Sequence, residues 1–232
     1  MVTSSDVSTV SIVIPTLNEE QSIGETLRRV QELKGQPEII VADGGSSDRT
    51  TTIAGDFGVK VLTAERGRGM QLRAGAAQAS GDVLWFLHAD THPPRDAISH
   101  IVSAIHDSNA VGGNFRLRFT GNGWGTWFTS AYQPILRSCQ VMYGDSAIFA
   151  RRDVYEKCGG MGDLPLFEDL DLVRRLKKFG RVITVPAIVT TSSRRFEGRS
   201  FSRTFAQWTL LQVLYWVGVS PKRLARMYKD IR

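Results

Sequence analysis

The chain has 232 residues, of which 42% are hydrophobic and 22% are charged, and its formal net charge is +6. These proportions are typical of a folded globular domain and exclude a disordered or fibrous chain. Two cysteines, Cys139 and Cys158, are too few for a disulfide framework, so we expect a reducing, cytoplasmic compartment. The sequence has no run of about 18 apolar residues, so we expect no transmembrane helix. The N-terminal MVTSSDVSTV lacks the pattern of a secretion signal. The positive charge is compatible with nucleotides, phosphates or anionic lipid; we expect no nucleic-acid partner.

The first half of the sequence alternates short apolar runs with segments of helical periodicity. The helical segments carry apolar residues three or four positions apart, as Ile23, Leu27 and Val30 do. Strands that alternate with helices at this spacing predict a parallel α/β sheet covered by helices. The apolar runs predict strands at Val10–Ile14, Glu38–Ala42, Val59–Thr63 and Val83–Leu87.

The second half has a different pattern. Residues 114–119 alternate between polar and apolar side chains, which predicts a half-exposed strand. A helix follows Pro165. The segment 181–189 is strand-like, and Pro186 predicts that this strand is either an edge strand or a bulged one.

The apolar run that ends at Leu87 is followed by a candidate metal site. A run without polar residues is typical of a strand buried on both faces. In open α/β sheets, ligands bind at the carboxyl edge of the central strands, which is where His88-Ala89-Asp90 would lie. A carboxylate and an imidazole at that edge could hold a divalent cation such as manganese or magnesium. The alternative is that Asp90 only caps the helix that follows Pro94.

Two further segments could contact a nucleotide at the same edge. Asp43 directly follows the second predicted strand, at an edge where a carboxylate can accept hydrogen bonds from a base or a ribose; its alternative role is to shape the turn. The segment Arg66-Gly67-Arg68-Gly69, with Arg73 beyond it, is a candidate for gripping a diphosphate. Its glycines do not complete a G-x-G-x-x-G motif, because Leu72 stands at the third position.

A second acidic site is Glu168-Asp169, with Asp171 close behind. Carboxylates in the first turn of a helix interact favourably with the helix dipole, which is a purely structural role. A carboxylate kept ionised by a helix N-terminus is also suited to act as a general base at neutral pH. Both roles are compatible with the residues.

Five segments carry a resemblance to a known family: SIVIPTLNEEQSI, ADGGSSDRT, LRAGAAQASGDVLWFLHADTHPP, GDSAIFARR and FEDLDLVRRLKKFG. In this order, between about Ser11 and Gly180, they resemble a family 2 glycosyltransferase of the GT-A fold. The tail, with TSSRRFEGRSFSRTF and GVSPKRL, resembles a small bacterial subgroup of such enzymes. The resemblance implies a Rossmann-like, mostly parallel central sheet flanked by helices, with a C-terminal helical tail.

The resemblance also implies an activity and a donor site. A sugar would move from a nucleotide-diphosphate sugar to an acceptor hydroxyl, with inversion and with the help of Mn²⁺ or Mg²⁺. Pro15, Thr16 and Glu19 would line the nucleotide pocket, Asp43 would contact the base, and Arg73 would lie near the nucleotide.

The same resemblance implies roles for both acidic sites. His88-Ala89-Asp90 corresponds to the D-x-D motif of the family, in which Asp90 would ligate the metal. His88 stands where the family has the first Asp, which changes how the ribose and the metal are held. Asp169 would deprotonate the acceptor, and Glu168 would position the loop.

The tail carries an apolar block from Trp208 to Val219, followed by Lys222, Arg223 and Arg226. One interpretation is a packed C-terminal helix, with a homodimer interface as one form of that packing. The other is an interfacial membrane helix of a peripheral enzyme that acts on a lipid-linked acceptor. We favour the packed helix, because the basic residues follow the apolar block and do not form its opposite face.

We therefore predict a single GT-A domain over residues 1–232. It would comprise a nucleotide-sugar-binding half at about 9–110, an acceptor and catalytic half at about 111–199, and the tail at about 200–232. Two alternatives remain. One is a catalytically inactive nucleotide-sugar-binding module. The other is a sugar-1-phosphate nucleotidyltransferase, which would carry a glycine-rich, Lys-bearing segment where this chain has Pro15-Thr16-Leu17-Asn18.

Overall fold

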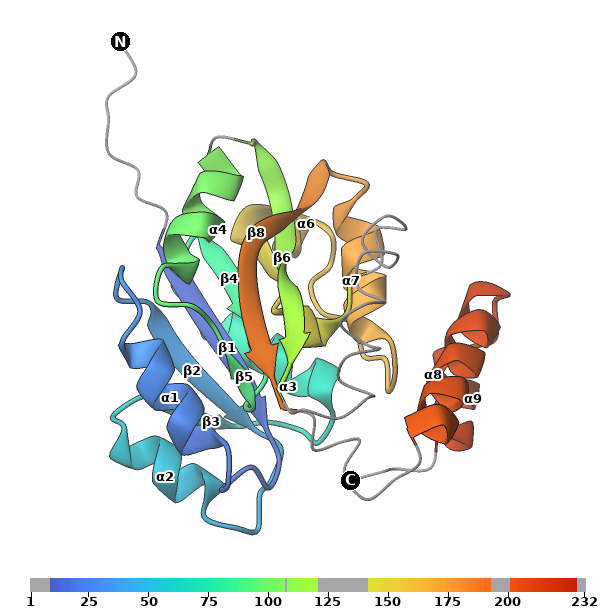
Figure 1. Cartoon of the computed structure of the whole chain (residues 1–232), viewed down its shortest axis with the longest axis horizontal. Coiled ribbons are helices and arrows are strands. Elements are labelled where there is room, and N and C mark those ends of the chain that lie inside the picture. The colour runs from blue at the N-terminus through green and yellow to red at the C-terminus, as the bar shows by residue number, and fades with distance from the viewer. Residues whose placement is uncertain (1–8, 107, 121–141, 193–200, 229–232) are drawn as a thin grey trace.

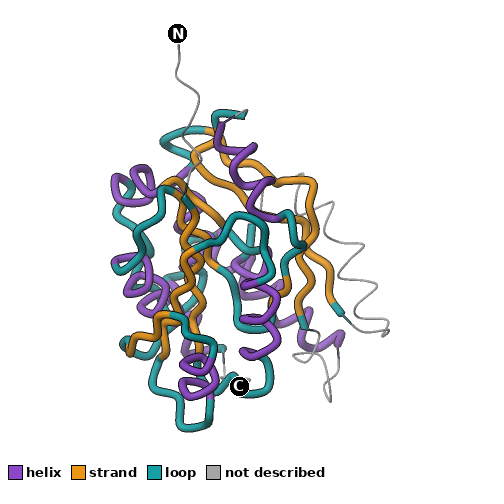
Figure 2. The backbone as a smooth tube through the Cα atoms, turned by 90° about the vertical axis from the view of Figure 1, so that its left-hand side faces the viewer, coloured by secondary structure: helices purple, strands orange, loops and turns teal. Residues whose placement is uncertain are grey.

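The computed structural model describes residues 9–106, 108–120, 142–192 and 201–228. In that part of the chain, an eight-stranded sheet forms the centre and helices cover both of its faces (Figures 1 and 2). The strand order is β3-β2-β1-β4-β7-β6-β8-β5. The strands are β1 Val10–Thr16, β2 Glu38–Asp43, β3 Lys60–Thr63, β4 Val83–Phe86, β5 Thr91–His92, β6 Ala110–Phe119, β7 Phe149–Arg151 and β8 Arg181–Thr191.

The helices follow the strands closely, as expected for an α/β chain. They are α1 Ile23–Gln31, α2 Thr50–Asp56, α3 Arg68–Ala77, α4 Ala97–His106, α6 Arg152–Lys157, α7 Glu168–Leu176, α8 Phe201–Trp216 and α9 Pro221–Met227, with a short 3-10 helix, η1, at Gly144–Ser146.

The first half of the sheet is parallel, as predicted. β1 pairs in parallel with β2 on one side and with β4 on the other, and β3 extends the sheet beyond β2. Parallel strands end at the same edge of a sheet. Thr16, Asp43 and the residues that follow Phe86 therefore lie near one another, and this edge is where open α/β sheets bind their ligands.

The second half makes the sheet mixed. β7 pairs antiparallel with β4 and β6, whereas β6 pairs in parallel with β8. The end of β6 alternates in burial, which confirms a half-exposed strand. Among the described residues, β8 pairs with β6 along most of its length, and the two-residue β5 joins it only at Thr190 and Thr191. At Pro186 the strand is therefore paired on one side, and the β6–β8 register also shifts opposite Pro186, between Asn114 and Arg116. Both predicted features, an edge and a bulge, are present, and each accommodates a residue without an N–H donor.

The hydrophobic core lies on both faces of the sheet. On one face, α1 and α4 pack through residues such as Leu27 and Ile101, and Trp85 of β4 belongs to this cluster. On the other face, α3 and α7 pack against Phe86, the next residue of the same strand. Successive side chains of a strand point to opposite faces, so this division confirms that β4 is buried on both sides.

The contact between α3 and β1 offers a test of the packing. A Cβ atom on Gly75 would lie 2.3 Å from Cγ1 of the buried Val13. We expect Gly75→Ala to destabilise the fold by about 1–3 kcal/mol through overpacking, although alanine is the better helix former. Gly55→Ala on α2 is the matched control, because a Cβ there meets no atom within 4 Å. Denaturant unfolding measures both; equal stability of the two variants would contradict this packing.

The C-terminal helices α8 and α9 form a hairpin that stands beside the sheet (Figure 1). Leu211 and Leu224 are buried, so each helix packs through one face, as expected for a packed tail. Leu210, Val213 and Trp216 of α8 are nevertheless exposed. None of the helices in the described residues is long and apolar enough to cross a membrane.

Candidate active site

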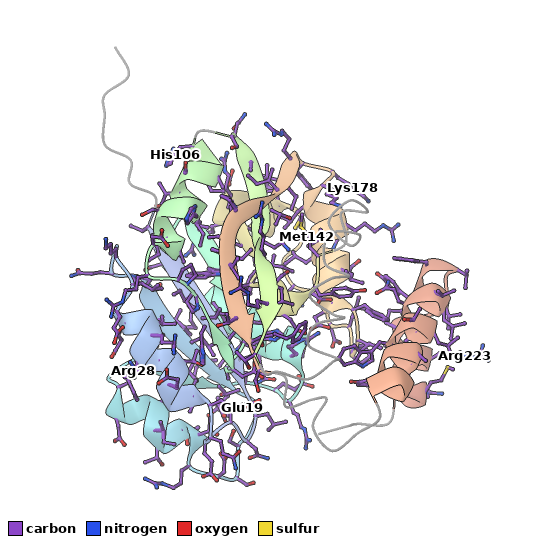
Figure 3. All side chains as sticks on the ribbon, in the orientation of Figure 1. Glu19, Arg28, His106, Met142, Lys178 and Arg223 are labelled. Carbon is purple, nitrogen blue, oxygen red and sulfur yellow. The ribbon has the colours of Figure 1, made fainter. Side chains whose placement is uncertain are left out.

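A cleft opens at the carboxyl edge of β1 and β4, where the sequence predicted a ligand site. Glu19, one of its lining residues, is labelled in Figure 3. The loop after β1, the start of α3 and the turn after β4 all contribute to its walls. Six predicted site residues line this cleft. The other three lining residues, Leu17, Arg68 and Gln71, were not predicted individually. The lining residues are Pro15, Thr16, Leu17, Glu19, Arg68, Gln71, His88, Ala89 and Asp90.

Gln71 fixes the floor of the cleft, and no pattern in the sequence predicted this role. Its side chain is buried, and Nε2 donates hydrogen bonds to the carbonyl oxygens of Thr16 at 2.6 Å and Ala42 at 2.9 Å. These bonds join the ends of β1 and β2. The available signal was its position four residues before Gly75, which places both residues on the helix face that packs on the sheet.

Asp43 organises the loop after β2. Its two carboxylate oxygens accept hydrogen bonds from the Thr16 hydroxyl (3.0 Å), the backbone N–H groups of Gly45 (3.0 Å) and Ser46 (2.8 Å), and the Ser46 hydroxyl (2.5 Å). A carboxylate offers about four acceptor positions, so these partners occupy all of them. This geometry supports the turn-shaping role, and the contact between Asp43 and a base stays a prediction.

The turn after β4 places His88 and Asp90 in the same cleft. The N–H of Thr91 donates to the carbonyl of His88 at 3.1 Å and closes the turn. His88 Nδ1 lies 2.9 Å from an Asp145 carboxylate oxygen, an interaction that fixes the orientation of the imidazole ring. Asp145 belongs to η1 and was not predicted individually, although it lies in the GDSAIFARR segment that carried the family resemblance.

The residues at this turn fit a divalent cation that is completed by a ligand. Among residues 9–106, 108–120, 142–192 and 201–228, no group of three or more His, Cys, Asp and Glu side chains could hold a metal ion by itself. Asp90 is buried and lines the cleft. Mg²⁺ and similar ions are commonly held by one or two carboxylates, several waters and the phosphates of a substrate. A single carboxylate beside a polar cleft suits that mode.

The two predicted acidic residues, Glu168 and Asp169, are buried beside the guanidinium group of Arg68. Glu168 is 2% exposed and Asp169 is 6% exposed, at the start of α7. The guanidinium of Arg68 forms an ion pair with Glu168 and reaches within 3.8 Å of Asp169 Oδ2. The N–H of Gly144 donates to Asp169 Oδ2 at 2.5 Å, and the N–H of Leu170 donates to Oδ1 at 2.7 Å.

This environment changes the acidity of Asp169. Burial raises the pKa of its carboxyl group, and the charge of neighbouring Glu168 raises it further; Arg68 and the two N–H donors oppose the shift without cancelling it. Burial alone would lower the pKa of Arg68, but the two carboxylates outweigh it and raise that pKa, so the cation persists. A carboxylate with a raised pKa is better matched to accepting a proton near neutral pH.

Arg68 belongs to the segment predicted to grip a diphosphate, but its described partners are carboxylates. It lines the cleft and also pairs with the acid pair, so it connects the two acidic sites. Arg66 and Arg73 are exposed and are not among the residues that line the cleft. Their contact with a nucleotide stays a prediction.

Gly144 is the point where both acidic sites meet. A methyl group on Gly144 would lie 3.1 Å from His88 Nε2 and 3.2 Å from Asp169 Oδ2. The imidazole after β4 and the carboxylate at the start of α7 therefore flank the same backbone atom. A Cβ here would be tight against both side chains, which would have to shift by a few tenths of an ångström. The glycine thus lets the predicted donor site and the predicted base lie close together.

Two further sequence hypotheses fall largely outside the described residues. Trp124 and Trp127, with Tyr143, could form a platform for the acceptor, and Arg194, Arg195 and Arg199 could close over the diphosphate; of these, only Tyr143 is described. The Tyr143 hydroxyl donates to Gln212 Oε1 of α8 at 2.9 Å.

The fold and the site together define a class of protein. A mostly parallel sheet with a polar cleft at its carboxyl edge, and a carboxylate at the end of a central strand, is the arrangement of nucleotide-binding α/β domains. The sequence model of "Glycosyl transferase family 2" matches residues 11–158. The chain belongs to this family.

Curated relatives agree with the family match. The "Probable glycosyltransferase YdaM" of Bacillus subtilis (strain 168) is 32% identical over 219 residues, which cover 78% of this chain and 50% of the relative. The "Dolichol-phosphate mannosyltransferase" of Pyrococcus furiosus is 30% identical over 161 residues, covering 65% of this chain and 44% of the relative. The chain thus spans half or less of the length of these two relatives.

Solved structures confirm the GT-A fold. A mannosyltransferase from Pyrobaculum calidifontis, in complex with GDP-Man and Mn²⁺, superposes with a TM-score of 0.70 at 19% identity, covering 94% of this chain and 68% of that one. Glucosyl-3-phosphoglycerate synthase from Mycobacterium tuberculosis, in complex with Mg²⁺ and UDP, gives a TM-score of 0.63 at 20% identity, covering 91% and 80%.

Proposed function

We propose that this chain transfers a sugar from a nucleotide-diphosphate sugar to an acceptor hydroxyl, with inversion at the anomeric carbon and with a divalent metal ion at Asp90. The observation that carries the proposal is the meeting point at Gly144. There a buried carboxylate of raised pKa, Asp169, lies next to the end of the donor cleft.

The relatives and structural neighbours support this choice of donor and metal. One neighbour was solved with GDP-Man and Mn²⁺, and another with UDP and Mg²⁺. Family membership favours a transferase over an inactive binding module or a nucleotidyltransferase. The curated relatives include transferases that act on dolichol phosphate and undecaprenyl phosphate, which makes a lipid-linked acceptor a reasonable choice.

The residues divide the reaction between them. Asp169 takes the proton of the acceptor hydroxyl as the acceptor oxygen attacks the anomeric carbon. The bond between that carbon and the diphosphate oxygen breaks, and the electron pair leaves with the nucleoside diphosphate. Attack from the face opposite the leaving group inverts the anomeric configuration. The positive charge of Arg68 offsets the repulsion between the carboxylates of Glu168 and Asp169, and Glu168 holds Arg68 in place.

The donor lies along the cleft in this proposal. Pro15, Thr16 and Glu19 line the nucleotide end, and the turn with His88 and Asp90 lies at the diphosphate end. Asp90 would hold the cation, and a bound cation neutralises charge on the departing diphosphate. His88 keeps its orientation through Asp145 and fills the place of the first carboxylate of the D-x-D motif.

Asp90→Asn tests the metal. Nucleoside diphosphates should stabilise the wild-type protein more with manganese than with a chelator. With manganese the total stabilisation should reach about 2.7 kcal/mol when the ligand is near 100 times its dissociation constant. Asp90→Asn should lose the metal-dependent part. Asp56→Asn, an exposed position on α2, is the matched control and should keep it. Equal stabilisation of the wild type by nucleotide with manganese and with chelator, in thermal melts, would remove the metal from this proposal.

A further inference from the structure

The outward face of α8 is apolar, which is the reverse of an ordinary surface helix. Its exposed residues recur three or four positions apart and so form one stripe along the helix. Leu210 is 54% exposed, Val213 45%, Trp216 61% and Val217, just beyond the helix, 72%. A surface helix normally places polar side chains there. The outward stripe comprises Ala206, Thr209, Leu210, Val213, Trp216 and Val217.

The inward face of α8 holds the helix in one orientation. Leu211 and Gln212 are buried. The ring of Tyr215 packs on Phe167 at a centroid distance of 4.8 Å. Gln212 accepts the hydrogen bond from Tyr143. Because this face is engaged with the catalytic half of the domain, the outward stripe is a fixed surface of the protein.

Cations accompany the outward stripe. Lys222, Arg223 and Arg226 of α9 are exposed, and Met227 beside them is 49% exposed. Arg223 lies on the side of the hairpin that is turned away from the sheet (Figure 3). The sequence contains no Asp or Glu from 198 to 228. Within the described hairpin, residues 201–228, the exposed face therefore combines a tryptophan, large aliphatic side chains and positive charge without an acidic side chain.

We propose that the α8–α9 hairpin binds the surface of an anionic lipid bilayer. Aliphatic side chains and Trp216 enter the boundary between headgroups and acyl chains, where tryptophan is favoured. The cations of α9 pair with anionic headgroups. A second copy of the chain fits less well. In a two-fold dimer the same patch of both copies meets, so the three cations of each hairpin would gather although residues 201–228 contain no carboxylate side chain to offset them.

The position of the hairpin has a consequence for the acceptor. Phe167 and Tyr143, which contact its inward face, directly precede Glu168 and Gly144 of the active site. A membrane bound to the outward face would therefore lie on the acceptor side. This consequence rests on the proposed function, and it favours an acceptor hydroxyl or phosphate carried by a lipid. The surface itself does not depend on transfer activity.

Vesicle flotation of the full chain tests the surface without donor or acceptor. We expect the wild-type protein to float with vesicles of phosphatidylglycerol and phosphatidylcholine, to bind phosphatidylcholine alone far more weakly, and to lose binding as salt screens the charges. Lys222→Glu, Arg223→Glu and Arg226→Glu together should weaken binding on the order of 100-fold, since each cation near an anionic surface contributes about 1 kcal/mol. If the triple variant does not fold, Arg223→Glu alone is tested in the same assay and should weaken vesicle binding by a smaller factor.

The apolar half of the surface has its own variants and controls. Leu210→Ser with Val213→Ser should reduce flotation at least about tenfold, given the apolar area that each side chain buries. Trp216→Phe should remove most of the blue shift of tryptophan emission on binding. Phe179→Ser and Lys178→Glu are matched controls, because both positions are exposed at the end of α7, and they should bind like the wild type.

Two results would overturn the proposal. One is a wild-type protein that stays off anionic vesicles at low salt, or that binds neutral and anionic vesicles equally. The other is a concentration-dependent dimer in analytical ultracentrifugation that the Leu210→Ser and Val213→Ser variant abolishes. That dimer would assign the outward stripe to a second copy of the chain.

Discussion

Replacing Asp169 with asparagine should lower turnover by about 10² to 10⁴, the usual contribution of a general base. The amide keeps the shape and can still accept the Gly144 hydrogen bond, but it cannot take the acceptor proton. Affinity for donor and metal should stay within a few-fold, because Asp169 is not among the residues that line the donor cleft. In the wild type, the raised pKa of Asp169 should move the acidic limb of the rate profile above the ordinary aspartate range.

The matched control for Asp169→Asn is Asp171→Asn. Asp171 carries the same charge in the same first turn of α7, but its partner is Arg175 at 2.8 Å. If the carboxylates only stabilise the helix dipole, both variants should lose similar stability and neither should lose much turnover. Glu168→Gln should have a milder effect on turnover than Asp169→Asn. An Asp169→Asn protein that retains most of its turnover would place the base elsewhere.

Arg68→Met should destabilise the protein by about 3 kcal/mol at neutral pH. Breaking a buried ion pair from one side commonly costs about 3–5 kcal/mol, because a charge is left without compensation. The lower end applies, since the Arg68 side chain is 25% exposed. Denaturant unfolding would measure the loss. Arg68→Met combined with Glu168→Gln should recover much of it, because one of the two carboxylates is then neutral.

The loss should depend on pH with a definite sign. Without Arg68, burial and the neighbouring charge of Glu168 raise the pKa of Asp169 in the folded state further above its value in the unfolded chain. The folded state then binds a proton more readily, so stability falls as pH rises through the raised pKa. The difference from wild type should therefore shrink on acidification toward the ordinary carboxyl range, at about pH 4. A loss that grows on acidification would contradict this electrostatic arrangement.

The α/β half of the fold was predictable because its signals are local. The runs that end at Ile14, Ala42, Thr63 and Leu87 are short and apolar, with helical periodicity between them, and each forms the expected strand. Such patterns report burial directly. The position of β8 was only half predictable. Pro186 predicts an irregular strand. The two-residue β5, which pairs with the end of β8, is too short for its sequence to show a strand pattern.

The positions of the candidate site residues were predictable where each follows from its own strand, and less so where two residues far apart in the sequence pair with each other. His88 and Asp90 follow a buried strand, so their place at the carboxyl edge follows from the strand itself. Arg68 is separated from Glu168 by a hundred positions, and no local pattern indicates that pairing. Gln71 is similar, because a buried amide that bridges two strand ends looks like any polar residue of a helix.

The tail shows a different limit. An apolar block from Trp208 to Val219 is compatible with a packed helix and with an interfacial one, because apolar residues occur all around α8. Only tertiary structure decides which side is covered. Here Leu211 is covered and Leu210 is exposed, a distinction between neighbouring residues that composition does not contain.

The most direct test of the proposed function follows the fate of the donor. The protein is incubated with manganese, candidate lipid-linked acceptors and a panel of nucleotide-diphosphate sugars, and phosphorus NMR monitors the products. The proposal predicts that one donor yields a nucleoside diphosphate, that Asp90→Asn and chelator suppress this release, and that Asp169→Asn nearly abolishes it while still binding the donor. Donor that binds but is never consumed would identify a binding module. Formation of pyrophosphate from a nucleoside triphosphate and a sugar phosphate would identify a nucleotidyltransferase, and either result would contradict the proposed transfer.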